Sequence, residues 1–143
     1  MKDNEMSIRE LEEGKELRLD FEKVNRVLAQ SPGVIPVAVQ NADTKEVILI
    51  AYTNKEAFEK SIRTRIATFW STSRNELWIK GETSGNLFEL EEVYVNCEQN
   101  SLVYRVNPKG EGICHTYNSK GEARNCFYRR LDPTTGVLKN TNP

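Results

Sequence analysis

The chain has 143 residues, with 20 lysines and arginines against 21 aspartates and glutamates, so its formal net charge is −1. This length fits one domain with a real hydrophobic core, and the near-neutral charge leaves no electrostatic footprint for nucleic acid or an anionic membrane. No apolar run approaches the length of a membrane span, and the polar, acidic start is unlike a signal peptide. An odd number of cysteines, three, argues against a disulfide framework and favours reduced thiols in the cytoplasm.

The first 19 residues are charged and only loosely patterned, and we treat them as an N-terminal extension. A short helix is predicted from Phe21 to Ala29, with Asp20 as its N-cap and Ser31-Pro32-Gly33 as its stop. Its apolar residues share one face, which predicts a docking or covering element.

A β-hairpin is predicted next. Residues 34–40 and 46–52 are rich in valine and isoleucine and flank the turn-forming residues 41–45. The pattern Thr53-Asn-Lys-Glu56 then predicts a capping box. The helix that it opens should run to about Arg63 and bury Ala57, Phe58 and Ile62.

The rest of the chain has a β pattern. Four strands are expected, at residues 66–70, 77–79, 87–95 and 102–106, joined by turn-length connections. Such connections predict an antiparallel meander with one or two helices packed on it, so the fold class is α+β, mostly β. The single domain should have its core at about residues 20–131, followed by a polar, frayed tail at 132–143.

Two loops carry groups suited to binding phosphate. Ser71 and Arg74 lie in the turn after one predicted strand, and Lys80, Thr83 and Ser84 lie in a glycine-flanked turn after the next. Hydroxyls, exposed amides and cations at strand ends are what phosphate oxygens need. The alternative is that both are ordinary polar hairpin turns. Neither has the spacing of a P-loop.

All three cysteines and the only histidine lie between residues 96 and 128. Three thiolates with one open position would suit a catalytic zinc centre. Their spacing matches no zinc-finger template, however, and free cysteine is often a buried small hydrophobe, so both readings stay open. His115 follows Cys114 directly, and its imidazole suits acid–base chemistry beside a metal, although it could also be an ordinary surface side chain.

Several blocks of this sequence resemble phosphoribosyl-AMP cyclohydrolase, an enzyme family of histidine biosynthesis. The matching blocks follow one another in the family's order from about Val34 to Arg130: IPVAVQ at 35–40, TFWS at 68–71, SRNELW at 73–78, KGETSG at 80–85, CHT at 114–116 and NCFY at 125–128. This number of ordered blocks identifies the chain as a member of the family or a close offshoot.

The resemblance implies hydrolysis of 1-(5-phosphoribosyl)-AMP, opening the adenine ring between N1 and C6. It implies Zn²⁺ held by Cys97, Cys114 and Cys126, contributed by both subunits of an intertwined homodimer. Zinc with an open position would lower the pKa of its water, as in nucleobase deaminases. We assign the proton shuttle to His115, and phosphate or ribose binding to five side chains: Ser71, Arg74, Lys80, Thr83 and Ser84.

The chain departs from the family pattern at three places. The family's Asp-Cys-Asp-x-Asp, whose aspartates form a Mg²⁺ site, reads Asn96-Cys97-Glu98-Gln99-Asn100 here. Amides bind Mg²⁺ far less well than carboxylates, so Asn96, Glu98 and Asn100 are a weak magnesium site or another group replaces it. The loop from Thr116 to Asn125 is longer, and Thr72 stands where the family often has arginine.

Two other functions remain open at this stage. The chain could be a related zinc hydrolase for another purine nucleotide, or a non-catalytic, zinc-stabilised binding domain. The retained Cys114-His115-Thr116 argues against the second, because a purely structural site does not need His115. The chain is also too short for a fused pyrophosphatase domain, so we expect a monofunctional, cytoplasmic homodimer that acts on a small nucleotide.

Overall fold

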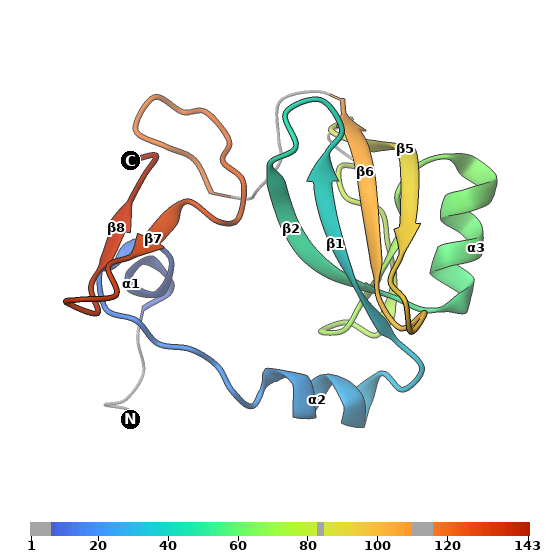
Figure 1. The fold of residues 1–143 in the computed structure, drawn as a ribbon, viewed down its shortest axis with the longest axis horizontal. Helices are drawn as coiled ribbons and strands as arrows, with labels where there is room; N and C mark the ends of the chain where they lie inside the picture. The colour runs from blue at the N-terminus through green and yellow to red at the C-terminus, as the bar shows by residue number, and fades with distance from the viewer. Residues whose placement is uncertain (1–6, 83–84, 110–115) are drawn as a thin grey trace.

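The computed structural model describes residues 7–82, 85–109 and 116–143 of the chain. A four-stranded sheet forms its centre, in the order β2 (Val47–Thr53), β1 (Ile35–Asn41), β6 (Leu102–Pro108), β5 (Phe88–Val95) (Figure 1). The α+β class and the dominance of antiparallel pairs agree with the sequence prediction. Among the residues described, no helix is long and apolar enough to cross a bilayer.

The predicted single meander is wrong in two respects: residues 69–71 and 76–78 pair in a separate two-stranded sheet, and one pair in the central sheet is parallel. β1–β2 and β5–β6 are antiparallel hairpins, but β1 and β6 are parallel, with Val37 opposite Leu102. After β2 the chain leaves the sheet and returns as β5 at the far edge, so the hairpin's second strand, β6, arrives beside β1 in the same direction. A crossover connection of this kind is what parallel neighbours require.

The hydrophobic core lies on one face of the sheet. The period of two along each strand puts alternate side chains there. Val37 and Val39 of β1 are fully buried against Leu49 and Ala51 of β2, and Tyr104 of β6 lies opposite Val39. Phe69 joins this cluster, with its ring centroid 6.0 Å from that of Tyr104.

Helix α3 (Lys55–Thr64) covers the sheet beside β5 in Figure 1. Its N-cap is Asn54, whose Oδ1 accepts the Ala57 amide at 2.9 Å, so the capping box predicted at Thr53 is wrong by one residue. Thr53 is instead a buried residue at the end of β2, where its hydroxyl donates to the Asn54 carbonyl at 3.2 Å. Ala57 is buried as predicted, but Ile62 is 40% exposed, and Ser61 takes the buried position.

Helix α2 (Lys23–Gln30) begins two residues later than predicted. Asp20 is not its N-cap. The Asp20 carboxylate accepts the amide of Glu22 at 3.1 Å, and Glu22 precedes the first residue of the helix. Val27 is the one buried residue of α2, whereas Phe21, just before the helix, is 84% exposed. The apolar face predicted for this segment is therefore largely uncovered.

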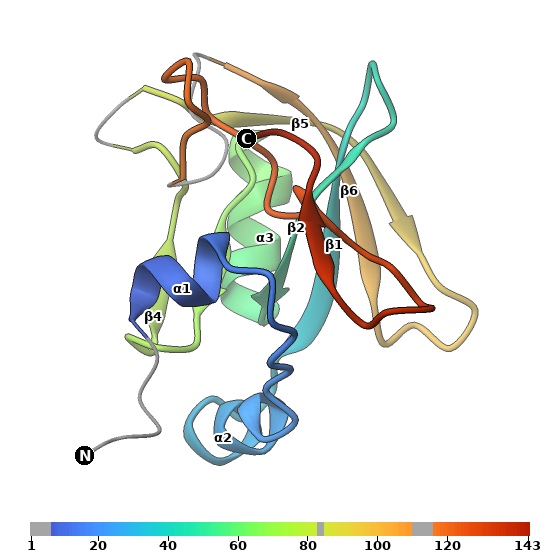
Figure 2. The same ribbon diagram turned by 90° about the vertical axis from the view of Figure 1, so that its left-hand side faces the viewer.

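Residues 7–16 and 116–143 form a structured unit. β7 (Arg129–Leu131) and β8 (Leu138–Asn140) pair as a hairpin, and β8 with the connecting turn lies in the stretch 132–143 that was predicted to be frayed. Helix α1 (Ile8–Glu13) lies against them, and the Leu138 amide donates to the Lys15 carbonyl at 2.8 Å. We call α1 and residues 116–143 the terminal module, which stands beside β2 in Figures 1 and 2.

Candidate active site

A cavity of about 410 Å³ opens along β2 where the β3–β4 hairpin and the start of α2 approach it. The hairpin is short, with β3 (Phe69–Ser71) paired to β4 (Glu76–Trp78). Its turn contributes most of the polar lining, and strand β2 contributes the apolar floor. The side chains with functional chemistry in the lining are Lys23, Tyr52, Trp70, Ser71, Thr72, Ser73, Arg74, Trp78 and Cys126.

The turn between β3 and β4 presents hydroxyls and a guanidinium to this cavity. Ser71 Oγ accepts the Arg74 amide at 3.3 Å and lies 3.4 Å from Ser73 Oγ. Asn75 closes the turn in the left-handed region, at φ 56°, which asparagine tolerates better than most residues. The Arg74 Nε lies 3.6 Å from a Glu76 carboxylate oxygen, and both side chains are largely exposed. The guanidinium therefore remains accessible to a ligand.

Cys126 is the predicted zinc ligand that lies at this cavity. Its thiol is exposed and not in a disulfide. The backbone is fixed on β2, because the Cys126 amide donates to the Ile48 carbonyl at 2.8 Å and the Asn125 side chain donates to Glu46 at 3.0 Å. An exposed, positioned thiol of this kind suits a metal ligand better than a core residue.

Cys97 lies elsewhere, in the turn between β5 and β6, and its thiol is also exposed and not in a disulfide. Asn96 organises this turn: its Oδ1 accepts the amides of Asn100 and Ser101, both at 2.9 Å, and its Nδ2 donates to Asn100 at 2.7 Å. Two of the three side chains predicted for magnesium thus bind each other and the backbone. Glu98 is exposed in the same turn.

The two described cysteines lie at opposite edges of the sheet. Cys126 is bonded to β2, one edge strand, and Cys97 follows β5, the other edge strand. Neighbouring strands are about 4.8 Å apart, and a zinc–sulfur bond is only about 2.3 Å long. In the part of the chain that the structure describes, no three histidine, cysteine or acidic side chains gather as a metal site.

The remaining predicted site residues do not line the cavity or fall outside the described ranges. Lys80 is absent from the cavity lining, and its Nζ lies 5.8 Å from the centroid of the Phe88 ring. Thr83, Ser84, Cys114 and His115 are outside the described residues.

Sequence reasoning missed several contributors to the cavity, among them Lys23, Tyr52 and the two tryptophans. Lys23 lay in a helix to which no function was given, and Trp70 and Trp78 were seen only as strand residues. The spacing of the tryptophans held a usable signal, because they flank the predicted phosphate turn. No local sequence pattern indicated that Lys23 is a site residue, because its position at the cavity depends on how α2 packs.

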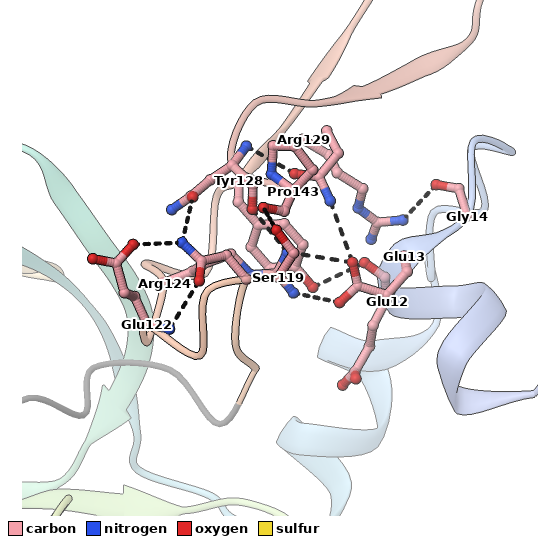
Figure 3. Close-up of polar contacts among 12 residues, drawn as sticks. Glu12, Glu13, Gly14, Ser119, Glu122, Arg124, Tyr128, Arg129 and Pro143 are labelled. Atoms are coloured by element: carbon pink, nitrogen blue, oxygen red, sulfur yellow. Dashed lines mark hydrogen bonds and ion pairs between the residues drawn. The ribbon is translucent and has the colours of Figure 1, made fainter.

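The segment that carries Cys126 is also held by contacts with α1. Arg124 is fully buried and pairs with Glu13 of α1 (Figure 3). Its Cζ lies 3.7 Å from the centroid of the Tyr128 ring, and the Tyr128 hydroxyl donates to the Glu12 carbonyl at 2.8 Å. Burial raises the pKa of the Tyr128 hydroxyl above its ordinary value. These contacts attach the N-terminal extension to both sides of Cys126.

Concave sites with aromatic walls and a few polar groups are typical of proteins that bind small molecules. The cavity therefore places this protein among those that bind small molecules. The hydroxyls of its lining, together with Arg74, favour a phosphorylated ligand. Comparison with known proteins narrows the class. The family model described as phosphoribosyl-AMP cyclohydrolase matches residues 49–128.

Three relatives illustrate the likeness. A phosphoribosyl-AMP cyclohydrolase from Nitrosopumilus maritimus is 46% identical over 79% of this chain and 93% of that protein. One from Desulfatibacillum aliphaticivorans is 39% identical over 81% of this chain and 83% of that protein. A bifunctional histidine biosynthesis protein from Thermus thermophilus is 52% identical over 69% of this chain and 44% of that protein. The chain belongs to the phosphoribosyl-AMP cyclohydrolase family.

Proposed function

We propose that this protein hydrolyses phosphoribosyl-AMP, opening the purine ring between N1 and C6 in histidine biosynthesis, at a site shared by two subunits. The activity follows from the family to which the chain belongs. The observation that supports its location is the convergence of Ser71, Arg74 and Cys126, each selected from the sequence, on one cavity.

The donor set favours Zn²⁺ as the cofactor. Exposed thiols that are not in a disulfide, such as Cys97 and Cys126, are soft ligands that suit zinc. Their placement at opposite sheet edges is explained if each zinc is held by Cys114 and Cys126 of one subunit and the partner's Cys97. When bound, zinc would lower the pKa of water and so supply a nucleophile at neutral pH.

An uncovered sheet face supports the homodimer. Ile50 is 53% exposed although it is in the middle of β2, and Tyr94 on β5 is 45% exposed. These two side chains belong to an apolar surface on the face opposite the core, which is completed by Pro36, Ala38 and Val103. A contiguous exposed apolar patch on a central sheet is typical of a protein–protein interface.

The chain's own residues would bind and orient the nucleotide. Trp70 and Trp78 line the cavity and supply faces on which a purine can stack. Ser71 and Arg74 offer donors to phosphate oxygens, and Arg74 can do so in bidentate fashion. We assign the transfer of the proton to the leaving ring nitrogen to His115, which is outside the described residues.

Magnesium would have a reduced role in this chain. The Asn96 side-chain oxygen already accepts two backbone amides, so binding a cation there would break hydrogen bonds that hold the turn. We therefore propose that Asn96 and Asn100 act as a turn cap, and that Glu98 is the one carboxylate left for a cation. This change also keeps open a related purine nucleotide as substrate.

The test is an assay of purified protein with phosphoribosyl-AMP, following absorbance of the ring-opened product while zinc is measured by metal analysis. We expect turnover that needs zinc and changes little when magnesium is titrated or chelated. Cys126→Ser should lose both zinc and turnover while keeping the native circular dichroism. A folded, zinc-loaded dimer with no turnover at any magnesium concentration would contradict the substrate assignment.

A further inference from the structure

Lys23, the first residue of α2, lines the same cavity as the phosphate-binding turn. We propose that Lys23 binds a phosphate group of the substrate together with Arg74, so that α2 is part of the substrate site. This inference rests on the proposed function, because it names a further ligand for the same nucleotide. Lys23 lies outside the residues matched by the family model, which begin at 49.

The charges around the cavity favour an anion. Its lining contains two side-chain cations, Lys23 and Arg74, and no carboxylate among the described residues. Arg74 has Glu76 as a neighbour at 3.6 Å, which partly balances its charge. Lys23, in contrast, makes no side-chain ion pair with any residue that the structure describes. Its charge is therefore available to a ligand.

The position of Lys23 in its helix points the same way. Lys23 is the first residue of α2 and follows the N-cap Glu22, and no residue of the helix's first turn is acidic. A cation at the positive end of the helix dipole is unfavourable for the helix. Lys23 is therefore poorly explained as a helix-stabilising residue, whereas its ammonium would attract a bound phosphate.

Helix α2 is anchored to the hairpin that carries Arg74. Ser31, which follows the helix and is buried, donates its hydroxyl to Asn75 Oδ1 at 2.9 Å. The same oxygen accepts the indole Nε1 of Trp70 at 3.1 Å. Asn75 thus ties the end of α2 to the β3–β4 turn, and the buried Val27 adds an apolar contact point. These ties hold α2 beside the hairpin, and Lys23 lines the cavity from the other end of the helix.

The substrate's composition explains why cations from more than one element are useful. Phosphoribosyl-AMP carries a phosphate on each of its two ribose groups, so both ends of the molecule are anionic. Lysine acts on phosphate as a mobile point charge, while arginine adds directional hydrogen bonds. Lys23 and Arg74 therefore complement each other around one phosphate.

The test uses tryptophan fluorescence, since both tryptophans of the chain, Trp70 and Trp78, line the cavity. Binding of AMP to the zinc-loaded protein is measured by quenching, and KM and kcat for phosphoribosyl-AMP are measured in parallel. We expect Lys23→Met to weaken AMP binding and raise KM about tenfold, the usual size of a lost charged hydrogen bond, with kcat nearly unchanged.

Two further variants separate this role from simple loss of charge or fold. Lys23→Arg should recover most of the affinity, because it restores the cation. Lys15→Met removes one positive charge from an exposed position outside the cavity, and both binding and KM should stay at the wild-type level. Wild-type affinity and KM in a folded Lys23→Met variant would overturn the proposal. If the wild type binds AMP but does not turn over phosphoribosyl-AMP, the proposed function fails while the Lys23 result still stands.

Discussion

The central sheet and the terminal module are stabilised in different ways. The sheet buries a continuous apolar cluster, with Val37, Val39, Phe69 and Tyr104 fully enclosed. Helix α1 has no buried residue at all, and strands β7 and β8 have none either. The module is instead organised around one buried cation, Arg124, whose partners come from both chain termini (Figure 3).

This difference predicts different responses to substitution. Apolar packing spreads its free energy over many contacts, so a single change in the sheet lowers the stability of the whole unit. A buried charge depends on a few partners, and removing one leaves the charge uncompensated. The module should therefore open locally while the sheet stays folded.

The largest expected effect is in the sheet. Phe69 is fully buried, with its ring centroid 5.6 Å from that of Trp78. We expect Phe69→Ala to lower the free energy of unfolding by about 3–5 kcal/mol, measured by urea titration. The matched control is Phe21→Ala, which truncates a phenylalanine that is 84% exposed and should cost little. Similar losses for the two variants would contradict the assignment of the core.

A smaller and local effect is expected in the module. Glu13→Gln removes the charge that pairs with Arg124, and we expect a local cost of about 1–3 kcal/mol because the guanidinium stays buried. Hydrogen exchange should accelerate at the Leu138 and Thr141 amides, which bond to Lys15 and Tyr128, and remain unchanged at β1. Glu10→Gln, on the same helix but exposed, is the control. Equal acceleration in β1 and the module would show that they unfold as one unit.

Local patterns predicted much of the sheet. The valine- and isoleucine-rich runs gave the β1–β2 hairpin, and the long strand at 87–95 matches β5 within one residue. The parallel β1–β6 pair was missed because turn-length connections carry no information about which distant strands meet. The cap of α3 was misplaced because Thr53 and Asn54 are both good capping residues, and burial of Thr53 in β2 decided between them.

The module escaped prediction for a related reason. Residues 132–143 are polar, so they gave no apolar pattern, yet Asp132 organises a turn by accepting the Thr134 amide at 2.8 Å. The hairpin is held by partners more than one hundred residues away, such as Gly14, whose carbonyl accepts from Arg129 at 2.9 Å. Contacts of that sequence separation cannot be read from local composition.

The candidate site was predictable in its chemistry and only partly in its geometry. Ser71, Arg74 and Cys126 were chosen for their donor atoms, and all three line one cavity. Lys23 was missed because its approach depends on the Ser31–Asn75 contact that anchors α2. The sequence also could not predict that Cys97 and Cys126 lie at opposite edges of the sheet. This separation is the strongest structural argument for a zinc site shared between two subunits.

The sharing of zinc ligands between subunits is tested most directly by mixing two inactive variants. Cys97→Ser and Cys126→Ser are co-expressed with different tags, and turnover of phosphoribosyl-AMP is measured before and after purification of the doubly tagged dimer. If each site uses Cys97 of one subunit and Cys126 of the other, the mixture contains intact sites, and random pairing restores about one quarter of wild-type activity. Each variant alone should be inactive, and the doubly tagged dimer should bind one zinc at full affinity. A purified mixed dimer that remains inactive and binds no zinc would contradict the shared site.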